Sequence, residues 1–192
     1  MKRSPRPYRR EPRALLFLLL GALVMIWRVF TGDNAEVGPE LLAEGMHEVR
    51  RVVDGDTLLL SSGARVRLQG IDSPETVREG FAVEEWGIEA SRFTKDFVAS
   101  AGNRVRLTFG LERKDRHDRF LAFVWHDDLM LNEELVRSGL AHARLGYRYS
   151  GQMKRRLQRA QDDARRAGRG LWSKESRAKS KEQEEFSLPA LR

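Results

Sequence analysis

The chain has 192 residues, no cysteine and a formal net charge of +7. This length predicts one domain with appendages, and the lack of cysteine excludes disulfides and thiolate metal sites. The mild positive charge suits a polyanionic partner without requiring one.

The chain begins with a basic segment, and an uncharged apolar run, ALLFLLLGALVMIW, follows at 14–27. A run of this length after a basic flank is typical of a signal peptide or a short membrane anchor, with a buried core helix as the structural alternative. The flank predicts that the rest of the chain is exported. Val29, Phe30 and Thr31 form a poor cleavage site, which favours a membrane-anchored domain outside the cytoplasm over a secreted or periplasmic one. A start assigned too far upstream is a further alternative.

Composition divides the chain into four segments. A stretch with Gly and Pro after the apolar run predicts a linker, and strand-like runs begin near His47. The C-terminal residues 174–192 are rich in charged side chains, which predicts disorder. The expected segments are a basic leader with an anchor or signal (1–30, with 14–30 in the membrane if it is uncleaved), a linker (31–46), a folded domain (47–173) and a charged tail (174–192).

Four or five strand-like runs lie in the folded domain, among them VRRVVDGDTLLL, ARVRLQGI, NRVRLTFGL and RFLAFVWHDDLML. Gly, Asp and Asn turns separate them, which is typical of short antiparallel strands. In RVRL, strand alternation puts Arg65 and Arg67 on the face opposite Val66 and Leu68. The pattern predicts a mainly β member of the α+β class, a small barrel with helices packed on it.

Three helices are predicted, over 87–101, 132–140 and 153–168. The first has apolar residues at helical spacing, and Asn132 is the expected cap of the second. In the third, Leu157, Ala160 and Ala164 recur on one face and are expected to point inward.

Three polar clusters interrupt the strand region. The first is the DGDT segment with Asp56, the second runs from Arg67 to Asp72 and Glu75, and the third ends at Arg119. Each has an ordinary structural alternative, because DGD and SPE are common turn sequences and a lone arginine often marks a solvated strand end. Singly, none of them establishes a function.

Together the clusters favour phosphate chemistry. Carboxylates with a backbone carbonyl and waters offer the oxygen ligands that calcium prefers, and a cation would relieve the repulsion among Asp56, Asp72 and Glu75. Two arginines beside that cation are explained if a phosphate binds between them. Glu75 would then be free to orient or deprotonate a water. Metal, water, carboxylate and paired arginines are the working parts of phosphodiester hydrolysis.

These segments resemble the staphylococcal nuclease, or thermonuclease, family. The matching stretches are VVDGDTLLL, VRLQGIDSPET, GIEASRFTKDFV, DRHDRFLAFV, LNEELVRSGLA and RGLWS, in that order within 48–173. The resemblance implies an OB-fold, a five-stranded barrel with about three helices. It also implies calcium-dependent hydrolysis of DNA with low sequence specificity, leaves RNA open as a second substrate, and identifies 47–173 as the nuclease domain.

The resemblance further implies a role for individual residues. Carried over to this chain, the metal positions are Asp56, Asp72 and the carbonyl of Ser73, and the catalytic positions are Arg67, Glu75 and Arg119. Arg67 and Arg119 would stabilise the phosphate in its transition state. Glu75 would act on the attacking water, either as a base or as a positioning group.

The chain departs from the family near the third cluster. Arg116-His117-Asp118 stands where the family has Lys-Tyr-Gly, so a tyrosine that contacts a terminal phosphate is missing. We expect His117, Tyr147 and Tyr149 as candidate substrate contacts in its place.

A different class of function is a non-catalytic, membrane-tethered OB-fold module that binds single-stranded nucleic acid or a protein. Nuclease-like modules that only bind generally lack a metal or arginine position, whereas this chain has all of them. The sequence therefore favours the enzyme, as a monomer without an obligate protein partner.

Overall fold

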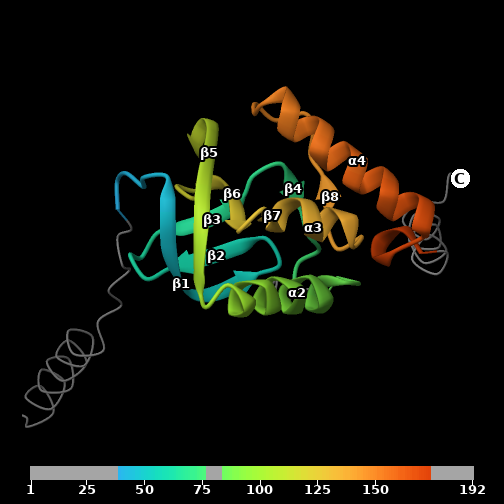
Figure 1. Cartoon of the computed structure of the whole chain (residues 1–192), viewed down its shortest axis with the longest axis horizontal. Helices are drawn as coiled ribbons and strands as arrows, with labels where there is room; N and C mark the ends of the chain where they lie inside the picture. Colours follow the sequence, from blue (N-terminus) through green and yellow to red (C-terminus); the bar gives the residue numbers. More distant parts are fainter. Residues whose placement is uncertain (1–38, 77–83, 174–192) are drawn as a thin grey trace, which may run out of the picture. The chain divides into compact units, whose positions relative to one another are not determined.

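A computed structural model describes residues 39–76 and 84–173 (Figure 1). Five strands close into a barrel: β1 (Gly45–Asp54), β2 (Thr57–Leu60), β3 (Arg65–Leu68), β5 (Arg104–Lys114) and β6 (Phe120–His126). Their order is β3-β2-β1-β5-β6 with antiparallel neighbours, and a parallel pairing of β3 with β6 completes the ring. The predicted OB-type barrel is confirmed.

The barrel interior is filled by the apolar face of alternating strands. In β3, Val66 and Leu68 are buried while Arg65 is exposed, and in β5 both Val105 and Leu107 are fully buried. Burying one such side chain contributes about 1.5–3 kcal/mol, so alternation fixes which face of each strand turns inward. It also leaves the opposite face of β3 free to carry polar side chains toward a surface cavity.

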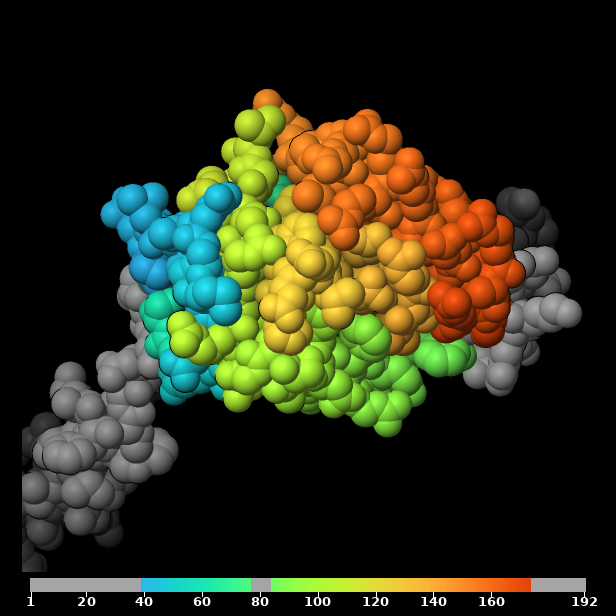
Figure 2. Space-filling view, in the orientation of Figure 1, coloured from blue at the N-terminus to red at the C-terminus, as the bar shows by residue number. Residues whose placement is uncertain are grey.

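Three helices pack against the barrel: α2 (Gly87–Ser100), α3 (Leu131–Arg137) and α4 (Gly151–Ala167). In the space-filling view, the atoms of α4 lie directly against those of α3, and α2 runs along the lower edge (Figure 2). The predicted inner face of α4 is confirmed, because Leu157, Ala160 and Ala164 are fully buried. Ser150 caps this helix by accepting the N–H of Met153.

Four short elements complete the domain. β7 (Leu129–Met130) pairs with β6, η1 (Gly170–Trp172) follows α4, and β4 (Ile71–Asp72) pairs with β8 (His142–Ala143) in a separate two-stranded ladder. The β4–β8 ladder connects the segment after β3 to the segment after α3. It therefore brings two distant parts of the chain to the same edge of the barrel.

The expected cap of α3 is wrong. Asn132 lies inside the helix, which begins at Leu131, and its side chain is fully buried. Its amide oxygen accepts the N–H of Val124 (2.9 Å), and its amide nitrogen donates to the carbonyl oxygens of Gln69 (2.9 Å) and Ala122 (3.2 Å). The barrel offers three buried partners, and satisfying them takes precedence over capping a helix end.

The predicted leader (1–30), the first half of the linker (31–46) and the tail (174–192) lie outside the described residues. Among the helices of the described residues, none combines the length and the apolar character that a membrane span requires.

Candidate active site

The first polar cluster forms the tight turn between β1 and β2. The Asp54 carboxylate accepts the N–H of Gly55 (2.7 Å), and the Gly55 carbonyl accepts the hydroxyl of Thr94 from α2 (2.5 Å). A Cβ at Gly55 would lie 2.7 Å from Oγ of Ser73, so the turn fits against its neighbours only with glycine here. These contacts fix the position of Asp56, the next residue.

Asp56 is a buried carboxylate that connects three segments. Its Oδ1 accepts the hydroxyl of Thr57 (3.1 Å), and its Oδ2 accepts the N–H of Ser73 (2.8 Å). Oδ2 also forms an ion pair with the guanidinium of Arg67. Only 7% of the Asp56 side chain is exposed, so its charge depends on these partners.

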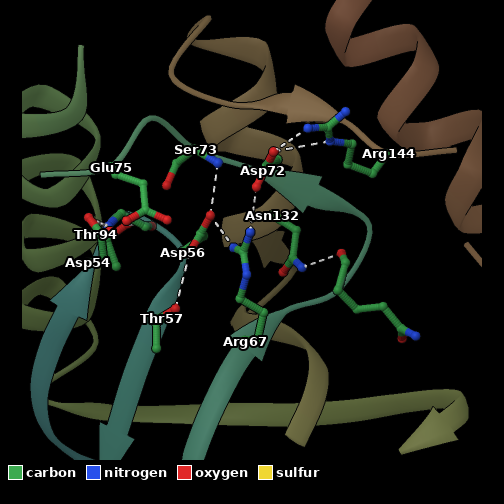
Figure 3. A network of polar contacts seen from close by, with 12 residues as sticks. Asp54, Asp56, Thr57, Arg67, Asp72, Ser73, Glu75, Thr94, Asn132 and Arg144 are labelled. Atoms are coloured by element: carbon green, nitrogen blue, oxygen red, sulfur yellow. Dashed lines mark hydrogen bonds and ion pairs between the residues drawn. The ribbon is translucent and has the colours of Figure 1, made fainter. Parts of the chain in front are cut away.

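Arg67 lies between two carboxylates (Figure 3). Besides its ion pair with Asp56, its Nη2 donates to Oδ1 of Asp72 at 2.7 Å. Burial lowers the pKa of Arg67, Asp72 opposes that shift, and the positive charge of Arg119 adds to it. A guanidinium remains charged in proteins, so Arg67 places one positive charge between the two aspartates.

Asp72 ends β4 and is more exposed than Asp56. Its second oxygen, Oδ2, accepts Nε of Arg144 at 3.1 Å and also pairs with Nη2 of that residue. Asp72 therefore has a different arginine on each carboxylate oxygen. Arg144 could not be predicted from the sequence, because no motif marks the segment that carries it.

Arg119 is positioned by a carboxylate within its own turn. Oδ1 of Asp115 accepts the N–H groups of His117 (2.9 Å) and Arg119 (3.0 Å), and Oδ2 accepts Nε of Arg119 (2.8 Å). Burial raises the pKa of Asp115, but these hydrogen bonds outweigh burial and hold it below its ordinary value. Asp115 was also missed, although its DRHDR spacing is typical of an aspartate turn.

Glu75 is an exposed residue in the segment after β4. Its N–H donates to the carboxylate of Glu84 (3.1 Å), and its carbonyl accepts the N–H of Glu84 (3.2 Å). A Cβ at Gly87 would lie 2.7 Å from that carbonyl oxygen, so the start of α2 approaches closely. The backbone is thus held, while the Glu75 side chain pairs with none of the described residues.

One cavity of about 1100 Å³ brings the predicted positions together. The predicted site residues that line it are Asp56, Arg67, Asp72, Ser73, Glu75, Arg119, His117 and Tyr147. Tyr149 is placed elsewhere: its side chain is buried, its ring packs edge-on against Phe123, and its hydroxyl donates to the carbonyl of Arg144 (3.0 Å). Burial raises the pKa of Tyr149 to about 12.

The donor set at this cavity fits a hard cation. Asp56 and Asp72 offer carboxylate oxygens, Ser73 offers a carbonyl, and the Oγ of Ser73 is buried without a hydrogen-bond partner among the described residues. Within those residues, no group of three or more His, Asp or Glu side chains is arranged to hold a metal ion. Arg67 already relieves the repulsion between Asp56 and Asp72, which is part of the repulsion that a cation was expected to relieve.

Comparison with known proteins decides the family. The family model for "Staphylococcal nuclease homologue" matches residues 65–174. The thermonuclease of Staphylococcus hyicus is 34% identical over 164 residues, which are 82% of this chain and 95% of that protein. The chain belongs to the staphylococcal nuclease family. Another thermonuclease, from Staphylococcus intermedius, is 34% identical over 164 residues, which are 83% of this chain and 96% of that protein.

A more distant relative is the endonuclease YncB of Bacillus subtilis. It is 29% identical over 127 residues, which are 65% of this chain and 60% of that protein. The matched range of the family model contains Arg67, Asp72, Glu75 and Arg119, whereas Asp56 precedes it.

Proposed function

We propose that the chain is a calcium-dependent nuclease that hydrolyses DNA, and RNA as a second substrate, with little sequence preference. It is a nuclease, a hydrolase of phosphodiester bonds, because it belongs to the staphylococcal nuclease family and matches thermonucleases over most of its length. The observation that supports the detailed proposal is the cavity into which Asp56, Asp72 and Glu75 converge with Arg67 and Arg119.

The proposed calcium ligands are the carboxylates of Asp56 and Asp72 and the carbonyl of Ser73. When bound there, a divalent cation would supply positive charge to the phosphate and lower the pKa of a coordinated water. The chain's own contribution is rigidity. Asp56 is held by a turn that Thr94 anchors from α2, and Asp72 is held by the β4–β8 ladder.

Arg67 and Arg119 are proposed to bind the phosphate that reacts. Arg67 comes from β3, Arg119 immediately precedes β6, and those strands pair in parallel, so both guanidinium groups reach the same cavity. Negative charge grows on the phosphate oxygens as water attacks. Two guanidinium groups that bind these oxygens stabilise that charge more than they stabilise the ground state, which lowers the barrier.

Glu75 is proposed to act on the attacking water. It lines the cavity with a fixed backbone, and its side chain has no partner among the described residues. A carboxylate in this position accepts a hydrogen bond or a proton from water as the oxygen attacks phosphorus.

A cleavage assay with the full chain tests the proposal on single-stranded DNA and on RNA. Cleavage should require calcium and stop with chelator. Glu75→Gln and Arg119→Ala should each lower kcat by several hundredfold, because a transition-state contact contributes about 3–4 kcal/mol. Arg159→Ala, at an exposed position on α4, serves as the matched control and should retain the rate. Cleavage that is unaffected by chelator, or full activity in both site variants, would refute the mechanism.

We also propose that the domain is a monomer that acts outside the cytoplasm, either anchored through 14–30 or released by cleavage. Support comes from the basic flank and the apolar run in the sequence. Cell fractionation with protease added from outside tests the location, since an anchored external domain is degraded in intact cells. A soluble cytoplasmic pool contradicts export, and gel filtration tests the monomer.

A further inference from the structure

Arg144 makes a contact at the candidate metal site. It directly follows β8, and its guanidinium reaches Asp72, with Nε 3.1 Å from Oδ2 and Nη2 paired with the same oxygen. The backbone of Arg144 is fixed on both sides: its N–H donates to the carbonyl of Gly70 (2.8 Å), and its carbonyl accepts the hydroxyl of Tyr149 (3.0 Å). The base of the side chain is therefore held, while the side chain itself is 52% exposed and lines the cavity.

The two candidate ligand carboxylates are already fully compensated in this structure. Asp56 and Asp72 carry two negative charges, and Arg67 and Arg144 supply two positive ones. A divalent cation gains less from a cluster without net charge than from one with a negative charge. For a cation to bind tightly, one guanidinium has to move away from the carboxylates.

Arg144 is the guanidinium that moves at least cost. Arg67 is 16% exposed and contacts both carboxylates, so its departure would leave the buried Asp56 unpaired. Arg144 contacts only the more exposed carboxylate, and water can solvate it as it leaves. The side chain would remain in the cavity, because its backbone stays anchored.

We propose that Arg144 is an internal counter-ion which a divalent cation displaces from Asp72, and that the released guanidinium then binds a phosphate of the nucleic-acid strand. This inference rests on the proposed calcium site. Arg144 has two alternative anionic partners, and the cation selects between them. Cation binding and strand binding are therefore coupled through this side chain, and each strengthens the other by the same factor.

Calcium titration of the full chain by calorimetry, without nucleic acid, tests the first step. Arg144→Gln should raise calcium affinity about tenfold, because it removes one positive charge beside the cation. Arg144→Lys retains the charge and should stay within about threefold of the wild type. Arg148→Gln is the matched control, an exposed arginine in the same segment that pairs with none of the described residues, and it should change nothing. Unchanged or weaker calcium binding in Arg144→Gln, or an equal rise in Arg148→Gln, overturns the inference.

Binding of a fluorescent single-stranded oligonucleotide tests the second step. Measured in a Glu75→Gln background to suppress cleavage, calcium should tighten binding, and adding Arg144→Gln should shrink that gain by about fivefold or more. An undiminished gain overturns the phosphate step. If no variant binds calcium, the proposed calcium site fails together with this inference. If the wild type binds calcium and cleaves DNA while Arg144→Gln binds calcium no more tightly, the inference alone fails.

Discussion

Replacing Asp115 with asparagine should lower nuclease activity by releasing Arg119. The amide oxygen of asparagine can still accept the N–H groups of His117 and Arg119, so the turn survives. The amide nitrogen, however, would stand where Oδ2 now accepts Nε of Arg119 at 2.8 Å and pairs with its Nη2 at 2.7 Å. Donor then faces donor, and the guanidinium loses its orientation.

The size of the loss follows from the exposure of this pair. A hydrogen bond to a charged group contributes about 1.5–3 kcal/mol. The side chains of Arg119 and Asp115 are 28% and 17% exposed, so solvent screening reduces that figure to about 1–2 kcal/mol. If this energy holds Arg119 in place for the transition state, kcat/KM should fall by about 5- to 30-fold.

A double-mutant cycle shows whether the loss passes through Arg119. Calcium-dependent cleavage of single-stranded DNA is measured for Asp115→Asn, Arg119→Ala and the double variant. The double variant should be no slower than Arg119→Ala alone, because Asp115 has nothing left to position. Asp118→Asn removes a carboxylate from the same turn, one that pairs with Lys114 instead, and should retain full activity. Additive losses in the double variant would refute the reasoning.

The same pair should make folding stability depend on pH. The folded-state pKa of Asp115 lies below its ordinary value of 3.8, since hydrogen bonds outweigh the opposing effect of burial. A depressed pKa stabilises the fold fully above the ordinary value, and the contribution is lost as pH falls through the folded-state pKa. Urea unfolding should therefore show wild type more stable than Asp115→Asn at neutral pH, with the difference vanishing in acid. A difference that grows in acid would contradict this assignment.

Three further substitutions test how the fold supports the site. Asn132→Ala should destabilise the domain by about 3–5 kcal/mol in urea unfolding, because it leaves buried N–H and carbonyl groups without partners; a loss below about 1 kcal/mol would contradict this. Gly139→Ala should lower the melting temperature in thermal unfolding more than Gly102→Ala does. Both glycines have positive φ, but a Cβ at Gly139 would lie 2.2 Å from a backbone oxygen, whereas a Cβ at Gly102 would meet nothing within 4 Å. Equal decreases in melting temperature for the two variants would show that the contact at Gly139 is not destabilising. Thr94→Val should lower stability by about 1 kcal/mol and weaken calcium binding, because the carbonyl of Gly55 loses its 2.5 Å partner; calorimetry showing unchanged calcium affinity would mean that this contact does not position the turn.

The parts of the fold that follow from local periodicity could be predicted from the sequence. Alternation in RVRL placed Arg67 opposite Val66 and Leu68, and the structure has those two apolar residues in the barrel core. Helical spacing likewise placed Leu157 and Ala160 on the inner face of α4. In both cases the side chains that decide the pattern are neighbours in the sequence, so no knowledge of tertiary contacts was needed.

Features that depend on contacts between distant segments could not be predicted in this way. Asn132 has the sequence context of a helix cap, and only the pairing of β3 with β6 brings the three backbone groups to which it bonds close together. The ion pair between Arg144 and Asp72 joins residues 72 positions apart. It depends on a ladder of two-residue strands, which are too short to leave a periodic signal.

The position of Arg67 sets the order in which charges can enter the cavity under the proposed mechanism. Its guanidinium now compensates Asp56, whose side chain is 7% exposed, and removing one partner of a buried ion pair costs about 3–5 kcal/mol. A phosphate can therefore draw Arg67 away only after a cation has taken over that carboxylate. Arg144 likewise leaves Asp72 when a cation compensates that carboxylate, and because this pair is exposed, separating it requires less free energy. Cation first and nucleic acid second is the order in which no buried charge is left uncompensated.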